Sequence, residues 1–325
     1  MNWSTTRRAS PGRTRSSGDP DIDRGSRVTG TRAAGTSVVF QVFVVSQEPV
    51  SKVQRLTEEL ARAPSRDFLM DVLTGAQAAG DATIPDERVA VWHFPGESVF
   101  HLRSRIPTLA GDADWIVILE DHNLIYPGWP DDVTDALRGA DPATSMLIGA
   151  ATNQRSTDAW SWANFLSVLG FHWAPCIQTP LEPLSFNVAI RRDALPKGRF
   201  ELGAYEALFV PRLMPGARPA PGFPVDHVQF RRFPEVIYYH WCNGRVTGAF
   251  MRQFADAGFG KVWSHAKNTS FQRQKRLRRV IRSHPGNHEL PRYTCARLQL
   301  LAFAHSLGAL HGGVRGTGRA PWALE

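Results

Sequence analysis

The sequence contains few cysteines and no long apolar run. Its three cysteines, Cys176, Cys242 and Cys295, lie far apart among 325 residues and match no spacing of a zinc site or a disulfide framework. We therefore expect reduced thiols in a cytoplasmic protein. No run approaches the ~18–20 apolar residues that span a bilayer, and the N-terminus shows no apolar signal segment. These absences argue against a disulfide-stapled secreted domain and against a membrane-spanning chain.

The N-terminal residues 1–36 are nearly devoid of large aliphatic side chains and are rich in Ser, Thr, Gly and Arg. Such a segment buries too little apolar surface to offset the entropy lost on ordering, so we expect a disordered basic tail. The whole chain carries a formal net charge of +8. This charge indicates an anionic partner: a nucleotide, a phospholipid surface or a nucleic acid.

Strand and helix patterns alternate along the first half of the chain. Apolar, β-branched runs indicate strands, and apolar stripes of period 3.6 indicate helices. Alternation with short connections implies right-handed crossovers. We therefore expect an α/β fold with a Rossmann-like mixed, mainly parallel sheet flanked by helices. The predicted strands are 38–45, 68–73, 88–92 and 115–119, and the predicted helices are 53–60 and 101–109.

The second half of the chain continues the same alternation with more aromatic residues. Asp131 or Asp132 could cap a helix that runs through Leu137. A further helix from 205 to 214 should be disturbed by Pro211. The other predicted elements are strands at 146–150, 186–192 and 236–241 and a helix at 158–169.

The C-terminal part combines a basic segment, 272–282, with an apolar segment, 297–310. One interpretation is a surface helix on anionic lipid, followed by a helix lying in the membrane interface. The other is a solvated helix face and a helix packed on the preceding domain, and we favour this second interpretation. Aromatic side chains do not alternate with the basic residues, which argues against nucleic-acid binding.

Three potential metal ligands, Glu120, Asp121 and His122, follow the apolar run 115–119 directly. In open α/β sheets the ligand site lies at the carboxyl ends of the strands. Acidic residues placed there can hold a divalent cation that neutralises the charge of a diphosphate. The alternative is that these are merely the polar residues with which any strand ends.

With these pieces in order, the chain resembles the inverting family 2 glycosyltransferases of the GT-A fold, in particular bacterial members with Glu-Asp-His in the metal-motif position. The resemblance covers about residues 37–255. It implies a GT-A domain over 37–265 and a helical C-terminal extension over 266–325. The matching segments are VVFQVFVVS, FPGESVFHLRSRIPTLAGDADWIVILEDHN, TDAWSWANFL, SFNVAIRRDAL, ELGAYEALFVPRL and HWCNGRVTGAF.

The resemblance implies roles for two groups of acidic residues. The Asp-X-Asp motif of the family, which holds Mn²⁺ or Mg²⁺ on the sugar nucleotide, falls on Glu120-Asp121-His122, and either Asp121 or His122 would reach the cation. The general base of the family lies before a helix that ends in Arg-Leu. Counting back from Arg212-Leu213 places this base on Glu206, with Glu201 as the alternative.

The resemblance also implies a set of residues that bind the donor or the acceptor. Arginine suits diphosphate contacts because its planar guanidinium presents a fork of donors. The matching positions are Arg103, Arg105, Asn187, Arg191 and Arg245.

One departure from the family pattern concerns the nucleobase contact. The family has an acidic pair after the second strand, whereas this chain has Asp71-Val72-Leu73-Thr74-Gly75 without an acid at the expected turn. The processive Gln-X-X-Arg-Trp signature is also absent, which favours addition of a single sugar. Two hypotheses remain: transfer from a nucleoside-diphosphate sugar to a glycan or lipid-linked acceptor, as in cell-envelope glycan synthesis, or a catalytically silent domain that binds a glycan or a partner protein.

Overall fold

The N-terminal tail is the first point at which structure and prediction differ. The computed structural model describes residues 26–29, 38–65, 67–77, 86–153, 157–177, 181–227, 233–254 and 258–324. Most of the predicted tail 1–36 lies outside these residues. Ser26–Thr29, however, form strand β1, which pairs antiparallel with β4 (Val89–His93) at the sheet edge. The prediction of disorder is wrong for these four residues.

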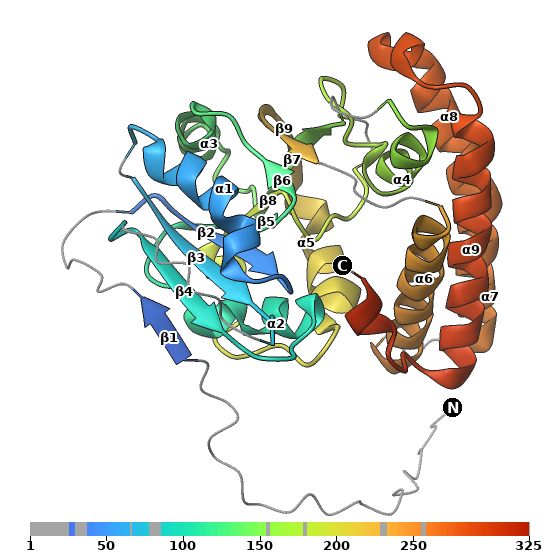
Figure 1. Ribbon diagram of the computed structural model, residues 1–325, viewed down its shortest axis with the longest axis horizontal. Coiled ribbons are helices and arrows are strands. Elements are labelled where there is room, and N and C mark those ends of the chain that lie inside the picture. Colours follow the sequence, from blue (N-terminus) through green and yellow to red (C-terminus); the bar gives the residue numbers. More distant parts are fainter. Residues whose placement is uncertain are drawn as a thin grey trace, which may run out of the picture.

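The sheet has nine strands in the order β1-β4-β3-β2-β5-β8-β7-β9-β6 (Figure 1). Strands β2, β3, β4, β5, β7 and β9 run in one direction, and β1, β6 and β8 run in the opposite direction. The predicted mixed, mainly parallel sheet is therefore confirmed. The remaining strand bounds are β2 (Phe40–Ser46), β3 (Phe68–Thr74), β5 (Trp115–Glu120), β6 (Asn123–Leu124), β7 (Met146–Thr152), β8 (Val188–Arg191) and β9 (Ala217–His227).

The direction of each crossover determines on which face of the sheet its helix lies. The chain moves from β2 to β3 through α1 (Val50–Arg62) and returns from β4 to β5 through α2 (Val99–Leu109). Right-handed crossovers in opposite directions place these helices on opposite faces. The sheet lies between these two helices, and Ile116–Leu119 of its strand β5 are fully buried.

Helix α3 (Trp129–Arg138) begins earlier than the sequence predicts. Gly128 stands at its N-cap, and no side chain caps the helix. The prediction that Asp131 or Asp132 caps this helix is therefore wrong. Both carboxylates lie in the first turn instead, where the partial positive charge of the helix N-terminus stabilises them.

Two errors of the sequence analysis concern the second half of the sheet. Strand β9 went unrecognised because it contains Pro219, Pro221 and Pro224, and proline cannot donate to a strand ladder. Its pairing with β7 shifts register between Gly149 and Ala151, which accommodates this proline-rich stretch. The predicted strand 236–241 is in fact the start of helix α6 (Glu235–Phe254).

Helix α6 forms although its first residues are aromatic and β-branched, because tertiary packing outweighs strand propensity. Buried residues recur at every fourth position: Val236, His240, Gly244 and Gly248. Such spacing places them on one face of a helix. This face packs against α9 (Thr294–Arg315).

The helices after the sheet form one packed group beside it (Figure 1). Helix α9 contacts α6, α7 and α4. The predicted domain boundary after residue 265 falls inside α7, and the division into a GT-A domain and a C-terminal extension stays a prediction. None of the helices within the described ranges combines the length and apolarity needed to cross a bilayer. The bounds in this group are α4 (Ala159–Leu169), α7 (Phe259–Lys267), the π-helical segment Asn268–Arg273 and α8 (Gln274–Ser283).

Glycines allow the backbones of α6 and α9 to approach closely. A Cβ at Gly244 would lie 1.9 Å from the carbonyl oxygen of His305, and one at Gly248 would lie 1.9 Å from that of Ala309. In return, a Cβ at Gly308 would lie 2.0 Å from the carbonyl oxygen of Trp241. Real atoms cannot approach so closely, so these positions require glycine.

We expect Gly248→Ala to destabilise the protein, because the added methyl group must push α6 and α9 apart. Overpacking of this kind lowers the free energy of unfolding by roughly 1–3 kcal/mol. The matched control is Gly260→Ala in α7, where a Cβ meets no atom within 4 Å. Thermal melting should show a lower midpoint for Gly248→Ala and an unchanged or slightly higher midpoint for Gly260→Ala. Equal midpoints for the two variants would show that α6 and α9 accommodate the methyl group without loss of stability.

Candidate active site

Three side chains converge where β5 and β9 end: Glu120, His122 and His227. The Nε2 atoms of the two histidines lie 3.0 Å apart. Oε2 of Glu120 lies 3.3 Å from Nε2 of His122 and 3.5 Å from Nε2 of His227. Among the described residues, this is the one group of three whose ligand atoms lie close enough together to hold a metal ion.

The pairing of β6 with β9 brings His227 to this place. Asn123 stands opposite His227 in the antiparallel ladder, so the last residue of β9 lies beside the turn that follows β5. Asn123 also stabilises this turn, because its Oδ1 accepts a hydrogen bond from the backbone N–H of Glu120 at 2.9 Å. The sequence analysis missed His227 because it lies 105 residues after His122 and ends a proline-rich strand.

Asp121 points away from the ligand cluster and orients His122 instead. Its Oδ1 lies 2.8 Å from Nδ1 of His122, and its Oδ2 accepts a hydrogen bond of 2.6 Å from Oγ of Ser46. Ser46 ends β2, the strand next to β5. A carboxylate on Nδ1 directs Nε2 of the imidazole toward a metal, which is a common arrangement around protein metal sites. Of the two residues proposed to reach the cation, it is His122 that faces the cluster.

The cluster fits a divalent transition metal. Its three ligand atoms are 3.0–3.5 Å apart, as expected for neighbouring ligands that lie about 2.0–2.2 Å from one ion. Two imidazoles and a carboxylate suit Mn²⁺ better than Mg²⁺, which prefers oxygen ligands.

Without a metal, a proton on His122 holds the cluster together. Burial alone lowers the pKa of His122, but the hydrogen bonds and charges of Asp121 and Glu120 outweigh burial and raise this pKa to about 10. Burial, together with the charge of His122, lowers the pKa of His227 to about 4. His122 is therefore charged and donates to the neutral ring of His227. A metal ion would have to displace this proton.

Arg103 of α2 lies between the ligand cluster and Glu206. Its guanidinium is buried and forms an ion pair with Oε1 of Glu120 through Nη2. Its Nη1 donates to Oε1 of Glu206 at 3.4 Å. Arg103 therefore joins one candidate metal ligand to the candidate base, and both of its terminal nitrogens contact carboxylates.

Glu206 lies in a π-helical segment, Tyr205–Phe209, that leads into α5 (Val210–Leu213). The predicted helix 205–214 is thus present in two parts, and such π-helical turns frequently occur at functional sites. Burial raises the pKa of Glu206, and the Arg103 charge only partly offsets this effect. Oε2 of Glu206 is buried and has no hydrogen-bond partner among the described residues. The alternative base, Glu201, is exposed and accepts a hydrogen bond from Gln253.

Two further predicted site residues have structural partners of their own. Arg105 is buried, forms an ion pair with Glu97 and stacks over the ring of Phe94 at 4.2 Å. Asn187 lies one residue before β8, at the same end of the strands as Glu120. Its Nδ2 donates to the carbonyl of Ala150 at 2.7 Å. It has a φ of 50°, and its Oδ1 is buried without a partner among the described residues.

Arg191 and Arg245 form no hydrogen bond or ion pair with the ligand cluster or Glu206 among the described residues. Arg191 pairs with Trp115 at the opposite end of β5, five residues or about 17 Å from Glu120 at ~3.3 Å per residue. Arg245 lies within α6 and not in a late loop; its Nε donates to the carbonyl of Gly316 at 2.9 Å. Register therefore separates Arg191 from Glu120, whereas the predicted roles of both arginines in binding donor or acceptor stay predictions.

Asp71, the acidic residue nearest the expected nucleobase position, has hydrogen-bond partners within the core. Asp71 is buried within β3, where it accepts hydrogen bonds from Nε1 of Trp92 at 2.7 Å and from the Gln41 side-chain amide. It is a core residue and does not face the turn after β3. The residues 78–85, which follow that turn, lie outside the described residues.

Comparison with known proteins supports the fold. No family model and no curated protein matches this chain. The mannosyltransferase PcManGT from Pyrobaculum calidifontis, solved with GDP-Man and Mn²⁺, has 13% identity and a TM-score of 0.52, covering 87% of this chain and 89% of that chain. Glucosyl-3-phosphoglycerate synthase from Mycobacterium tuberculosis has 14% identity and a TM-score of 0.38, covering 69% and 83%. The first similarity shows that this chain has a GT-A-type fold, and the second is too low to support a conclusion.

The charge on His122 predicts a pH dependence of stability for the metal-free protein. Because its folded pKa is raised from 6.5 to about 10, its contribution is complete below pH 6.5 and is lost as the pH rises through 10. Thermal midpoints measured in a chelator should therefore fall between pH 7 and 10 more steeply for the natural protein than for His122→Gln. Parallel curves would show that His122 is not charged in the folded state.

Proposed function

We propose that this protein is a metal-dependent inverting glycosyltransferase. It moves one sugar from a nucleoside-diphosphate sugar to a hydroxyl group of a glycan or lipid-linked acceptor. One observation carries the proposal: a set of cation ligands and a buried carboxylate with a raised pKa share the guanidinium of Arg103. The fold supports the donor class, because the mannosyltransferase of the same fold was solved with GDP-Man and Mn²⁺.

In this proposal Glu120, His122 and His227 hold the divalent ion, with Mn²⁺ preferred over Mg²⁺. The ion supplies positive charge to the diphosphate leaving group. Asp121 and Ser46 keep the ring of His122 in the orientation and tautomer that present Nε2 to the cluster. Arg103 serves as a positioning residue for Glu120 and Glu206 and does not bind the diphosphate itself.

Glu206 is the proposed general base. The acceptor oxygen attacks the anomeric carbon, the bond between that carbon and the phosphate oxygen breaks, and its electron pair leaves with the nucleoside diphosphate. Glu206 accepts the proton of the acceptor hydroxyl. Its raised pKa brings the carboxylate nearer the pH of the cell, where a base is most effective. Attack opposite the leaving group inverts the anomeric configuration.

The metal centre predicts the effects of three single substitutions. His122→Ala or His227→Ala removes one of three ligands and should abolish Mn²⁺-dependent binding of nucleoside diphosphates. Asp121→Asn should weaken Mn²⁺ binding by roughly 10–100-fold, the usual effect of losing a group that orients a ligand. Calorimetry with Mn²⁺ and GDP or UDP measures both effects, with the exposed His288→Ala as control. If His227→Ala binds normally, the metal lies elsewhere.

The base predicts a contrast between two glutamates. Glu206→Gln preserves shape but cannot accept a proton, so transfer should fall roughly 10²–10⁴-fold while donor affinity stays unchanged. Glu201→Gln, at the exposed alternative position, should retain full transfer. A screen of nucleotide sugars for Mn²⁺-dependent hydrolysis first identifies the donor. Loss of transfer only in Glu201→Gln would show that Glu201 is the base. Binding of glycans without any binding of nucleotides would instead support the catalytically silent domain.

A further inference from the structure

Helix α9 presents an apolar stripe to solvent on the side away from α6. Its exposed residues Leu300, Phe303, Leu307 and Val314 are 43–66% exposed. Their spacing of three, four and seven residues places them on one helical face. From Leu300 to Val314 the stripe rises over fourteen residue steps, or about 21 Å at 1.5 Å per residue. A solvated helix face of this length normally carries charged residues, and this one carries none at these positions.

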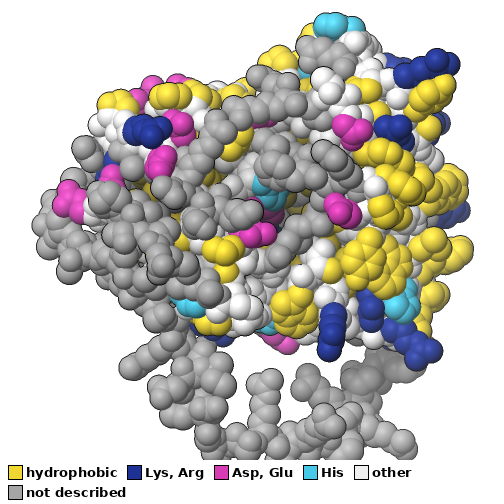
Figure 2. Space-filling view, viewed as in Figure 1, with side chains coloured by type: hydrophobic (Ala, Val, Ile, Leu, Met, Phe, Trp, Pro, Cys, Tyr) yellow, Lys and Arg dark blue, Asp and Glu magenta, His cyan; other side chains and the backbone are white. Residues whose placement is uncertain are grey.

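The π-helical segment adds an aromatic side chain to the same surface, and α7, which packs on α9, carries an exposed tryptophan. Phe271 of the π-helical segment is 57% exposed, and its ring contacts that of Phe303 at a centroid distance of 6.1 Å. Trp263 of α7 is 56% exposed. Figure 2 shows hydrophobic side chains gathered along the edge where Figure 1 places α7 and α9, with basic side chains among them.

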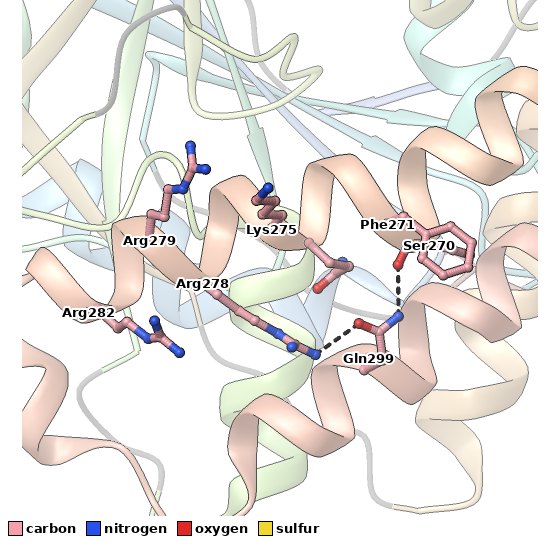
Figure 3. Close-up of a pocket in the computed structure, with 8 residues that line it drawn as sticks. Ser270, Phe271, Lys275, Arg278, Arg279, Arg282 and Gln299 are labelled. Carbon is pink, nitrogen blue, oxygen red and sulfur yellow. Dashed lines mark hydrogen bonds between the residues drawn. The ribbon is translucent and has the colours of Figure 1, made fainter.

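A cationic pocket adjoins this apolar surface. It has a volume of about 360 Å³ and lies between α8, the π-helical segment and α9. Its wall contains Phe271 of the apolar surface and four basic residues, as Figure 3 shows: Lys275, Arg278, Arg279 and Arg282. A second pocket of about 290 Å³ shares Arg278 and Arg282.

The charge in this pocket is uncompensated. None of the described residues that line it is acidic. Across the described part of the chain, no carboxylate forms an ion pair with Lys275, Arg279 or Arg282. Arg278 is held in place, because its Nη2 donates to Oε1 of Gln299, whose own amide donates to the carbonyl of Ser270. A site with these charges favours a phosphate-bearing anion.

We propose that this surface docks on an anionic phospholipid bilayer. A lipid phosphate binds in the pocket of Lys275, Arg278, Arg279 and Arg282, and the stripe from Leu300 to Val314 enters the membrane interface beside Phe271 and Trp263. Basic residues attract anionic lipid headgroups, and Trp is enriched at the interface. A second copy of the chain fits less well, because its own basic pocket would repel this one. The inner face of α9 stays packed on α6, so the helix docks as part of the folded protein and does not lie free in the interface.

The docking proposal is independent of catalysis, since no residue of the ligand cluster or its base lines the pocket. The test is sedimentation of the full chain with vesicles of phosphatidylcholine alone or with phosphatidylglycerol, at low and high salt. We expect binding only to the anionic vesicles, decreasing with salt. Arg279→Glu with Arg282→Glu should weaken binding at least tenfold, and Phe303→Ser with Leu307→Ser should weaken it at both salt concentrations.

The matched control reverses the same number of charges elsewhere, in the exposed Lys197→Glu with Arg212→Glu, and should bind as the natural protein does. Melting curves establish that each variant is folded. Equal sedimentation with neutral and anionic vesicles, or normal binding by both pocket and stripe variants, would overturn the proposal. So would light scattering that shows a dimer which Phe303→Ser with Leu307→Ser converts to a monomer. If the protein binds inorganic phosphate but no vesicle, the pocket is a site for a free anion instead.

Discussion

The organisation of the candidate active site depends on the guanidinium of Arg103. This buried cation contacts Glu120 at the end of β5 and Glu206 in the π-helical segment, so it fixes the distance between the candidate metal ligands and the candidate base. Removing one partner of a buried ion pair leaves an uncompensated charge, which typically costs about 3–5 kcal/mol. The arrangement therefore has a structural role as well as a chemical one, and α2 must be in place before either carboxylate is correctly held.

In the proposed site, a metal ion would have to displace the proton of His122. Without a metal, the imidazolium of His122 contacts Glu120, Asp121 and His227. In the proposed metal-bound state, an ion held by Glu120, His122 and His227 would take the place of that proton, while Asp121 would stay on Nδ1 of His122. Metal binding should accordingly release a proton. The pairing of β6 with β9 already holds the two histidines together in the metal-free protein.

Helix α9 has two faces of different character. Glycines at the α6–α9 contact bring the two backbones together, which leaves one face of α9 for the core and the other for solvent. The inner face is specified by small residues and the outer face by large apolar ones. A large apolar face is unusual for a solvated helix and is consistent with the proposed docking of this face on a membrane.

The sequence by itself determined the elements whose signals are local. The apolar run before Glu120 identified the central strand, and the polar residues after it identified one end of the site, because a buried strand needs only consecutive apolar residues. The tertiary structure alone decided which distant residues join them. His227 reaches His122 through a strand pairing across 105 residues, and register places Arg191 at the wrong end of β5. Helix α6 forms because its spaced glycines and small residues fit α9, and no local pattern contains that partner.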